Sequence, residues 1–143
     1  MPSRPPLVLD THVWIWVAEG QAERLAAPVI HEIGIASQEG RLHVSAISSW
    51  EVAMLVQKGR LTLAQDVRDW VAATRKPPGV LIAPITSEIA IDSAELPAFA
   101  HGHPADRLIT STARALSAEL VTCDEVLLRY GATGHVRTVD ARP

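Results

Sequence analysis

The chain has 143 residues and a formal net charge of −3, and 48% of its residues are hydrophobic while 20% are charged. This balance is typical of a single soluble globular domain, which we expect to span residues 1–143, and it excludes a disordered or fibrous chain. The negative charge excludes a general attraction for nucleic acid, and the single cysteine, Cys123, excludes an internal disulfide.

The first apolar run is Leu7–Leu9, which follows two prolines and is interrupted by Asp10. It is too short for a signal peptide or a membrane span, so we expect a cytoplasmic protein without membrane association. The run is typical of a buried strand. Asp10 or Thr11 can then cap a helix that continues through residue 17.

Short apolar runs alternate with amphipathic segments along the rest of the chain. We expect further strands at residues 42–44, 80–82, 120–122 and 136–139. Helices are expected from Pro28 to Gly40, from Ala46 to Gly59, from a capping box at residues 62–65 to the prolines at 77–78, from Thr86 to Leu96, from Pro104 to Leu116 and over residues 125–130. This alternation predicts an α/β fold with a mostly parallel central sheet covered on both faces.

Two acidic residues directly follow predicted strands. Asp10 comes after the strand at residues 7–9, and Asp124 follows the strand at 120–122 with only Cys123 between. Function in parallel α/β folds gathers at the carboxyl ends of the strands, so both acids are placed at the functional edge. Either acid could instead be a simple helix cap, which is the ordinary role of Asp between a strand and a helix.

Two further acids lie on the apolar faces of predicted helices. Glu51 is four residues from both Ile47 and Leu55, and Asp106 is three residues before Ile109. Packing alone would not place carboxylates there, because burying an unpaired carboxylate costs several kcal/mol. The alternatives are ion pairs within the chain, of Asp106 with Arg107 or Arg114 and of Glu51 with Lys58.

A set of converging carboxylates needs a cation to stay ionised. Oxygen ligands alone suit Mg²⁺ or Mn²⁺ rather than zinc. Such ions polarise a phosphoryl oxygen and activate water, and they allow an acidic protein to hold a polyanion. Metal-dependent cleavage of a phosphodiester is therefore the hypothesis that best accounts for the four acids.

Four segments of the sequence resemble PIN-domain ribonucleases of the VapC toxin type. They are residues 7–16 (LVLDTHVWIW), residues 44–53 (VSAISSWEVA) with KGRL at 58–61, residues 96–97 (LP) with HPADRLI at 103–109, and residues 120–125 (LVTCDE). The four occur in the family's order and span almost the whole chain. One departure is His103, which stands where the family usually has an Asp before the proline.

The resemblance implies a PIN-like α/β/α sandwich and a Mg²⁺-dependent endoribonuclease, the toxin of a type II toxin–antitoxin pair. By matching position, Asp10, Glu51, Asp106 and Asp124 would be its acidic quartet. Asp10 and Asp106 would bind the metal most directly, with Mn²⁺ as a possible substitute for Mg²⁺. The partners implied are an RNA substrate, a VapB-like antitoxin and a second copy of the chain in a homodimer.

Several other residues could take part in function. His12 could orient water or touch substrate, Thr11 and Thr122 could orient carboxylates or only cap, and the pair His101 and His103 has the spacing of a zinc site in a predicted loop. Cys123 has no catalytic base in its motif and is expected to be a small core residue.

The four tryptophans stand out beside a single Phe and a single Tyr. Trp14 and Trp50 lie on stripes that we expect to be buried. Trp16 or Trp70 could be exposed and serve a protein interface or stack on a base.

Two other classes of function compete with the nuclease. Phosphate transfer through an aspartyl nucleophile would need a second acid close to Asp10, and the segment Asp10-Thr11-His12 lacks one. A PIN-like binding module that has lost catalysis would have an incomplete set of family acids, whereas all four are present here.

Overall fold

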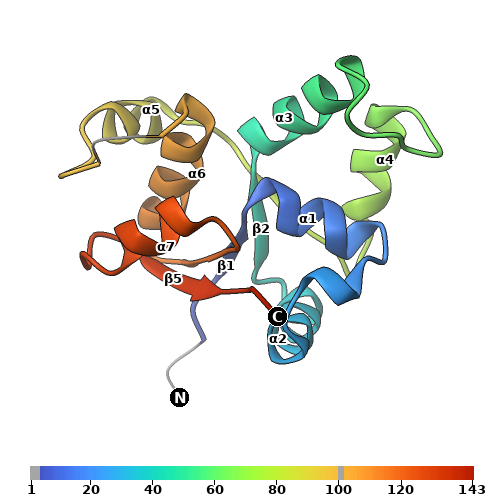
Figure 1. Ribbon diagram of the computed structural model, residues 1–143, viewed down its shortest axis with the longest axis horizontal. Coiled ribbons are helices and arrows are strands. Elements are labelled where there is room, and N and C mark those ends of the chain that lie inside the picture. The colour runs from blue at the N-terminus through green and yellow to red at the C-terminus, as the bar shows by residue number, and fades with distance from the viewer. Residues whose placement is uncertain (1–3, 100–101) are drawn as a thin grey trace.

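The computed structural model describes residues 4–99 and 102–143. The helices and strands, in chain order, are β1 (Leu7–Leu9), α1 (Thr11–Ala18), the 3-10 helix η1 (Ala22–Arg24), α2 (Ala27–Gln38), β2 (Leu42–Ser45), α3 (Ala46–Gln57), α4 (Val67–Thr74), β3 (Leu81–Ala83), α5 (Ser87–Ala94), α6 (Pro104–Ala115), β4 (Glu119–Thr122), α7 (Glu125–Gly131) and β5 (Arg137–Asp140). Strands and helices alternate as the sequence predicts (Figure 1).

In the described residues the strands form one sheet in the order β3-β2-β1-β4-β5, and every neighbouring pair is parallel. β1 lies at the centre, and Leu9 faces Val121 across the β1–β4 pair. The next residues along the two strands are Asp10 and Thr122, and the backbone N–H of Asp10 donates to the carbonyl of Val121 at 2.9 Å. This register carries Asp10 and the end of β4 to the same edge of the sheet.

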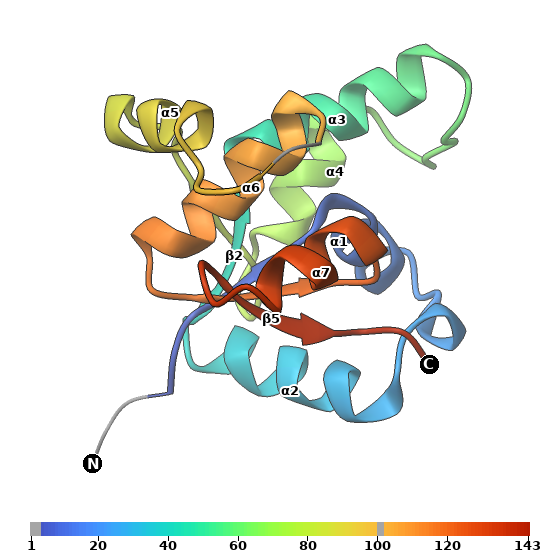
Figure 2. The same ribbon diagram turned by 60° about the vertical axis from the view of Figure 1, so that its left-hand side comes forward.

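Both faces of the sheet are covered, which confirms the predicted sandwich. Alternating side chains of β1 point to opposite faces, so Leu7 and Leu9 join one core cluster and Val8 joins another. The first cluster contains residues of α1, α2 and α4, and the second contains residues of α6 and α7. Figures 1 and 2 show these two groups of helices on either side of the strands.

Most helix ends follow the predicted signals. Pro28 lies in the first turn of α2, and the Thr86 hydroxyl caps α5 by accepting from Ile89 N at 3.1 Å. Gly40 and Gly59 directly follow the C-caps of α2 and α3 with φ of 70° and 71°, a conformation that glycine adopts without strain.

The capping box predicted at residues 62–65 is wrong. α4 begins at Val67 instead, because Asp66 caps it by accepting from Arg68 N at 2.8 Å. The third strand lies at Leu81–Ala83 and the fifth at Arg137–Asp140, each one residue later than predicted. No helix in residues 4–99 and 102–143 is long and apolar enough to cross a membrane.

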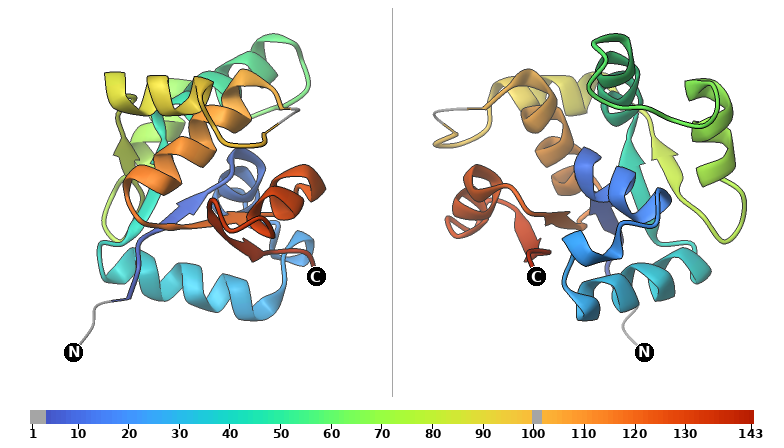
Figure 3. Two further views of the ribbon diagram at one scale, coloured as in Figure 1. Left: turned by 90° about the vertical axis from the view of Figure 1, so that its left-hand side faces the viewer. Right: turned by 45° about the vertical axis from the view of Figure 1, so that its right-hand side comes forward.

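α6 packs against both neighbouring helices and the sheet. It contacts α3, α5 and the three strands β1, β2 and β4, and Figure 3 shows it crossing one face of the sheet. Its buried residues include Ile109 and Ala113, as the helical spacing predicts. Because α6 packs against both α3 and β1, its first turn lies in the same part of the fold as the starts of α1 and α3.

Candidate functional site

The predicted acids lie at the carboxyl edge of the sheet or on helices that begin there. Asp10 is the N-cap of α1 and follows β1, and Asp124 is the N-cap of α7 and follows β4. Glu51 lies in the second turn of α3, which begins directly after β2. Asp106 lies in the first turn of α6. We refer to these residues together as the acidic cluster.

Asp10 is held by two hydrogen bonds. One carboxylate oxygen accepts from the backbone N–H of Thr11 at 2.8 Å, and the other accepts from the Thr122 hydroxyl at 2.7 Å. Burial raises the pKa of Asp10, the charge of Asp124 raises it further, and the two hydrogen bonds and the charge of His12 oppose this rise. Asp10 is thus a carboxylate fixed in place by its neighbours.

Thr122 links Asp10 to Asp124. Its hydroxyl donates to Asp10 and accepts from the backbone N–H of Asp124 at 3.0 Å. The Asp124 carboxylate accepts from Val126 N at 2.7 Å and from Leu127 N at 3.3 Å, which caps α7. The sequence left open whether this threonine orients a carboxylate or only caps a helix, and here its hydroxyl bonds a carboxylate.

Glu51 is held by a hydrogen bond from the Thr11 hydroxyl. The Thr11 hydroxyl lies 2.5 Å from Glu51 Oε1 and 2.8 Å from Ser48 Oγ, and Thr11 is only 1% exposed. A hydroxyl carries one proton, so Thr11 donates to the charged carboxylate and accepts from Ser48. Ser48 was not among the residues predicted from the sequence, although it lies three residues before Glu51 and therefore on the same face of α3.

Asp106 differs from Asp10 in its hydrogen bonding. No residue in the described part of the chain donates a hydrogen bond to its carboxylate. Its pKa is raised to about 6, first by burial and then by the negative charges of Asp10, Asp124 and Glu51, while the charge of His103 opposes this rise. The structure therefore brings Asp106 within electrostatic reach of the other three acids.

The internal ion pairs considered as alternatives for Asp106 and Glu51 are not present. Arg107 donates to the carbonyl oxygens of Ser93 and Phe99. Arg114 forms an ion pair with Asp92 at 3.0 Å. Among the described residues, Glu51 forms no ion pair with Lys58. The alternative role of Asp10 and Asp124 as helix caps is correct, and it coexists with their place in the acidic cluster.

The ligand chemistry of the cluster fits a hard divalent cation, because its donors are carboxylate oxygens and no described Lys or Arg forms an ion pair with them. Its carboxylates lie further apart than the ligands of a metal site that holds an ion. Within residues 4–99 and 102–143, no three His, Cys, Asp or Glu side chains are arranged closely enough to hold an ion.

The other candidate residues divide into buried and exposed groups. His12 is exposed on α1, and His103 is the exposed N-cap of α6, whereas His101 lies outside the described residues. Cys123 is partly buried against the first core cluster and is not one of its fully buried members, and burial raises the pKa of its thiol, which disfavours the nucleophilic thiolate.

The tryptophan predictions were half right. Trp14 is buried as predicted, but Trp50 is 56% exposed and the prediction that it packs in the core was wrong. Trp70 is only 3% exposed because it packs against Trp14, with ring centroids 4.8 Å apart. Trp16 is partly buried against the first core cluster. Helical spacing alone cannot say which face of α3 is covered, and Trp50 lies at a groove between α3 and α4.

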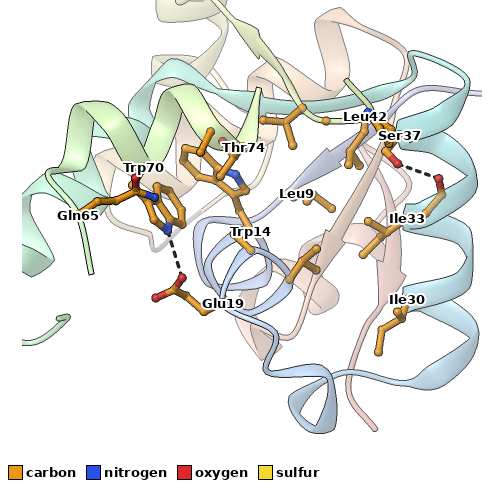
Figure 4. Close-up of a pocket in the computed structure, with 17 residues that line it drawn as sticks. Leu9, Trp14, Glu19, Ile30, Ile33, Ser37, Leu42, Gln65, Trp70 and Thr74 are labelled. Carbon is orange, nitrogen blue, oxygen red and sulfur yellow. Dashed lines mark hydrogen bonds between the residues drawn. The ribbon is translucent and has the colours of Figure 1, made fainter. Parts of the chain in front are cut away.

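A pocket of about 420 Å³ lies between α1, α2 and α4, with Leu9 at its base. Figure 4 shows Trp14 and Trp70 on one side and Ile30 and Ile33 on the other. Its lining is mainly apolar, and none of the four acids contributes to it. This pocket is therefore separate from the acidic cluster.

Comparison with known proteins gives concordant results. A family model described as PIN domain matches residues 7–132. The chain is 36% identical over 122 residues to Ribonuclease VapC22 of Mycobacterium tuberculosis (strain ATCC 25618 / H37Rv), an alignment that covers 85% of this chain and 88% of that protein.

Solved structures of low sequence identity share the fold. VapBC2 from Rickettsia felis, bound to a DNA fragment from its promoter, matches with a TM-score of 0.70 and 14% identity, over 94% of this chain and 98% of that one. DNA-bound VapBC from Salmonella typhimurium matches with a TM-score of 0.65 and 16% identity, over 96% and 98% of the two chains. These likenesses support the architecture of the sheet and its helices.

Proposed function

Since the chain belongs to the PIN-domain family, we propose that it is a Mg²⁺-dependent endoribonuclease whose active site is Asp10, Glu51, Asp106 and Asp124. The chief support is the carboxylate of Asp106. Burial and the charges of three other acids raise its pKa, and no described cation pairs with it. A protein seldom gathers acids in this way unless a bound cation offsets their repulsion.

In this proposal Asp10 and Asp106 hold the metal, and Glu51 and Asp124 complete the site through water or a second ion. Bound Mg²⁺, or Mn²⁺ in its place, supplies Lewis-acid activation of the phosphate and of the attacking water. The chain itself keeps Asp10 oriented through Thr122 and holds Glu51 through Thr11. Asp106, which lacks such bonds, is free to move toward a cation.

Ionisation of Asp106 is a further requirement that the chain imposes. With a pKa of about 6 before metal binding, this carboxyl group is partly protonated in mildly acidic solution. A protonated carboxyl group is a poor ligand for Mg²⁺, so metal binding has to release that proton. Cleavage is therefore expected to rise as the pH increases through about 6.

We further propose that the protein is the toxin of a VapBC-like type II toxin–antitoxin system and that residues 1–143 form a single PIN domain. The identity to a protein named Ribonuclease VapC22 supports an RNA substrate, and structural neighbours described as VapBC support a VapB-like antitoxin partner. A homodimer and a cytoplasmic place of action belong to the same proposal.

The test is cleavage of RNA by the purified protein with and without Mg²⁺, compared with the variants Asp10→Asn and Asp106→Asn. We expect cleavage that needs the metal and is lost in both variants. Unchanged cleavage in both would refute the assignment of the acidic cluster. A folded wild type that cleaves equally well in excess chelator would refute the metal requirement.

A second candidate is a PIN-like binding module without catalysis. It predicts that no divalent ion binds at the acidic cluster. Calorimetric titration with Mg²⁺ and Mn²⁺ separates the two, because the nuclease has to bind an ion at the acidic cluster. Heat of binding that disappears in Asp106→Asn supports the nuclease, and no heat in the wild type supports the binding module.

A further inference from the structure

A row of planar side chains runs along the exposed side of α1. The rings of His12 and Trp16 have centroids 5.8 Å apart and are tilted by 51°. The guanidinium of Arg24, from η1, lies 5.4 Å from the centre of the Trp16 ring. His12 and Arg24 are exposed and Trp16 is partly buried. We call these three residues the α1 row.

The α1 row starts at the acidic cluster and leads away from it. Asp10 caps α1, and His12 lies in the first turn of the helix, close enough for its charge to act on the Asp10 carboxylate. Trp16 follows one turn later on the same face. η1 contacts α1, and Figure 3 (right panel) shows the two blue segments side by side.

Arg24 is available to a ligand. In residues 4–99 and 102–143, no carboxylate forms an ion pair with its guanidinium and no hydrogen bond from that group is present. The face of α1 thus offers aromatic surface next to a positive charge that contacts the Trp16 ring and forms no ion pair among the described residues. This combination suits a chain of bases and phosphates, because bases stack on aromatic rings and Arg binds phosphate oxygens.

We propose that the α1 row binds single-stranded RNA beside the acidic cluster, with a base stacked at His12 and Trp16 and a backbone phosphate at Arg24. This inference rests on the proposed nuclease function and adds where the substrate lies. Unpaired bases are required, because a base inside a duplex does not present its face to a side chain. The α1 row then places the bound RNA strand relative to the phosphodiester that is cleaved.

A second exposed surface provides matched controls. Trp50 on α3 and Arg75 at the end of α4 line another groove together with Arg68. Trp50 is also exposed, and Arg75 carries the same charge as Arg24. Loss of either residue removes a tryptophan or an arginine without touching the α1 row.

Binding is measured by fluorescence anisotropy with a labelled single-stranded RNA of about eight nucleotides, within the site sizes of single-strand binding folds. The protein carries Asp106→Asn so that the RNA stays intact. We expect Trp16→Ala to weaken binding about tenfold, since stacking on one aromatic residue is worth about that much. Trp16→Phe should retain most of the affinity. Arg24→Gln should weaken binding about threefold and reduce the slope of log affinity against log salt by about 1.

Trp50→Ala and Arg75→Gln, in the same background, should bind within about twofold of the parent. The inference is overturned if Arg24→Gln leaves both affinity and salt slope unchanged, or if Trp50→Ala weakens binding as much as Trp16→Ala does. It is also overturned if a duplex of the same sequence shows the same dependence on Trp16. Arg24 is exposed, so its variant reports on binding even if Trp16→Ala fails to fold.

The two proposals fail in different ways. If wild type does not cleave RNA but the α1 row variants still weaken binding, the nuclease proposal fails and the binding surface stands. If wild type cleaves RNA and the row variants bind normally, the nuclease proposal stands and the α1 row does not bind substrate. Cleavage assays of the row variants, with Asp106 intact, then show whether the cut position shifts.

Discussion

The acidic cluster has two halves that differ in how the chain supports them. On the strand side, Asp10 accepts hydrogen bonds from the Thr122 hydroxyl and the Thr11 N–H, and Asp124 accepts from backbone N–H groups at the start of α7. On the helix side, Glu51 accepts one from the Thr11 hydroxyl, whereas Asp106 accepts none from any described residue, and burial and neighbouring acids raise its pKa to about 6.

The difference suggests separate tasks within one site. A carboxylate that also caps a helix contributes to stability whether or not a metal is present. A carboxylate held near other acids without donors is destabilising until a cation arrives. Under the proposed function, Asp10 therefore serves both fold and function, whereas Asp106 serves function at the expense of the metal-free fold. Changing one half at a time tests this contrast.

Asp106→Asn should have the largest effect. Loss of a charged group that stabilises the transition state costs roughly a thousandfold in rate, so we expect cleavage of a labelled RNA to fall by about that factor. The free energy of unfolding should not fall, because no hydrogen bond to this carboxylate from the described residues is lost. Asp69→Asn, at an exposed acid of α4, is the matched control and should cleave normally. Equal loss in both variants would mean that the cluster has no special role.

Asp10→Ala should damage the fold as well as the activity. It removes the cap of α1 and leaves the buried Thr122 hydroxyl without its acceptor, so unfolding should become easier by about 2 kcal/mol in a urea titration. Asp10→Asn keeps an oxygen that can cap, and should recover most of the stability while remaining inactive. If Asp10→Ala is as stable as Asp106→Ala, the contrast between the two halves is wrong.

The sequence predicted the elements of this site better than their interactions. Asp10 and Asp124 were placed at one edge because strands and their following residues can be recognised from short apolar runs. The register that sets Thr122 beside Asp10 depends on pairing between residues more than 100 positions apart, which local patterns do not encode. The same limit hid Ser48, whose partner Thr11 lies on another helix.

Whether each tryptophan is exposed or buried was harder to predict than the positions of the helices and strands. Trp50 and Trp70 both lie on helices, and only Trp50 is exposed, whereas the prediction placed Trp50 in the core and left the exposure of Trp70 open. Helical spacing identifies which residues share a face, but the neighbouring elements decide whether that face is covered. The start of α4 was also misplaced, because the Thr62–Gln65 pattern fits a capping box while Asp66 provides the cap.

The free energy of unfolding should also depend on pH through Asp106, and this effect is smaller than the two described above. The ordinary Asp pKa is 3.8 and that of folded Asp106 is about 6, so between these values the folded chain binds more protons than the unfolded chain. Its free energy of unfolding therefore decreases as the pH rises through this range and is lowest above it. Allowing for solvent screening of a partly exposed group, we expect a decrease of about 1 kcal/mol.

This decrease is measured by urea titration in chelator at about pH 4.5 and about pH 7.5. Asp106→Asn, which cannot ionise at this position, should show about 1 kcal/mol less decrease than wild type. Saturating Mg²⁺ should raise the stability of wild type at the higher pH, because the ion binds the folded chain. An identical pH dependence in wild type and Asp106→Asn would show that Asp106 is not strained by its neighbours.

Thr11→Val should have the smallest effect, because it alters only how Glu51 is held. Val keeps the shape of Thr but removes the hydroxyl, which costs the bond to Glu51 and leaves Ser48 without its acceptor. We expect unfolding to become easier by about 0.5–1 kcal/mol and cleavage to slow about threefold, since Glu51 remains present but loses its fixed orientation.

The double variant Thr11→Val with Ser48→Ala distinguishes the two consequences of removing the Thr11 hydroxyl. Ser48→Ala removes the buried hydroxyl that Thr11→Val leaves unpaired, so stability should be regained in part. Cleavage should stay slow, because Glu51 still lacks the donor that orients it. Recovery of both properties together would assign the effect of Thr11 to packing at the start of α1. Recovery of stability alone would show that a buried threonine positions one carboxylate of the helix-side half, which leaves Asp106 as the acid without a protein donor.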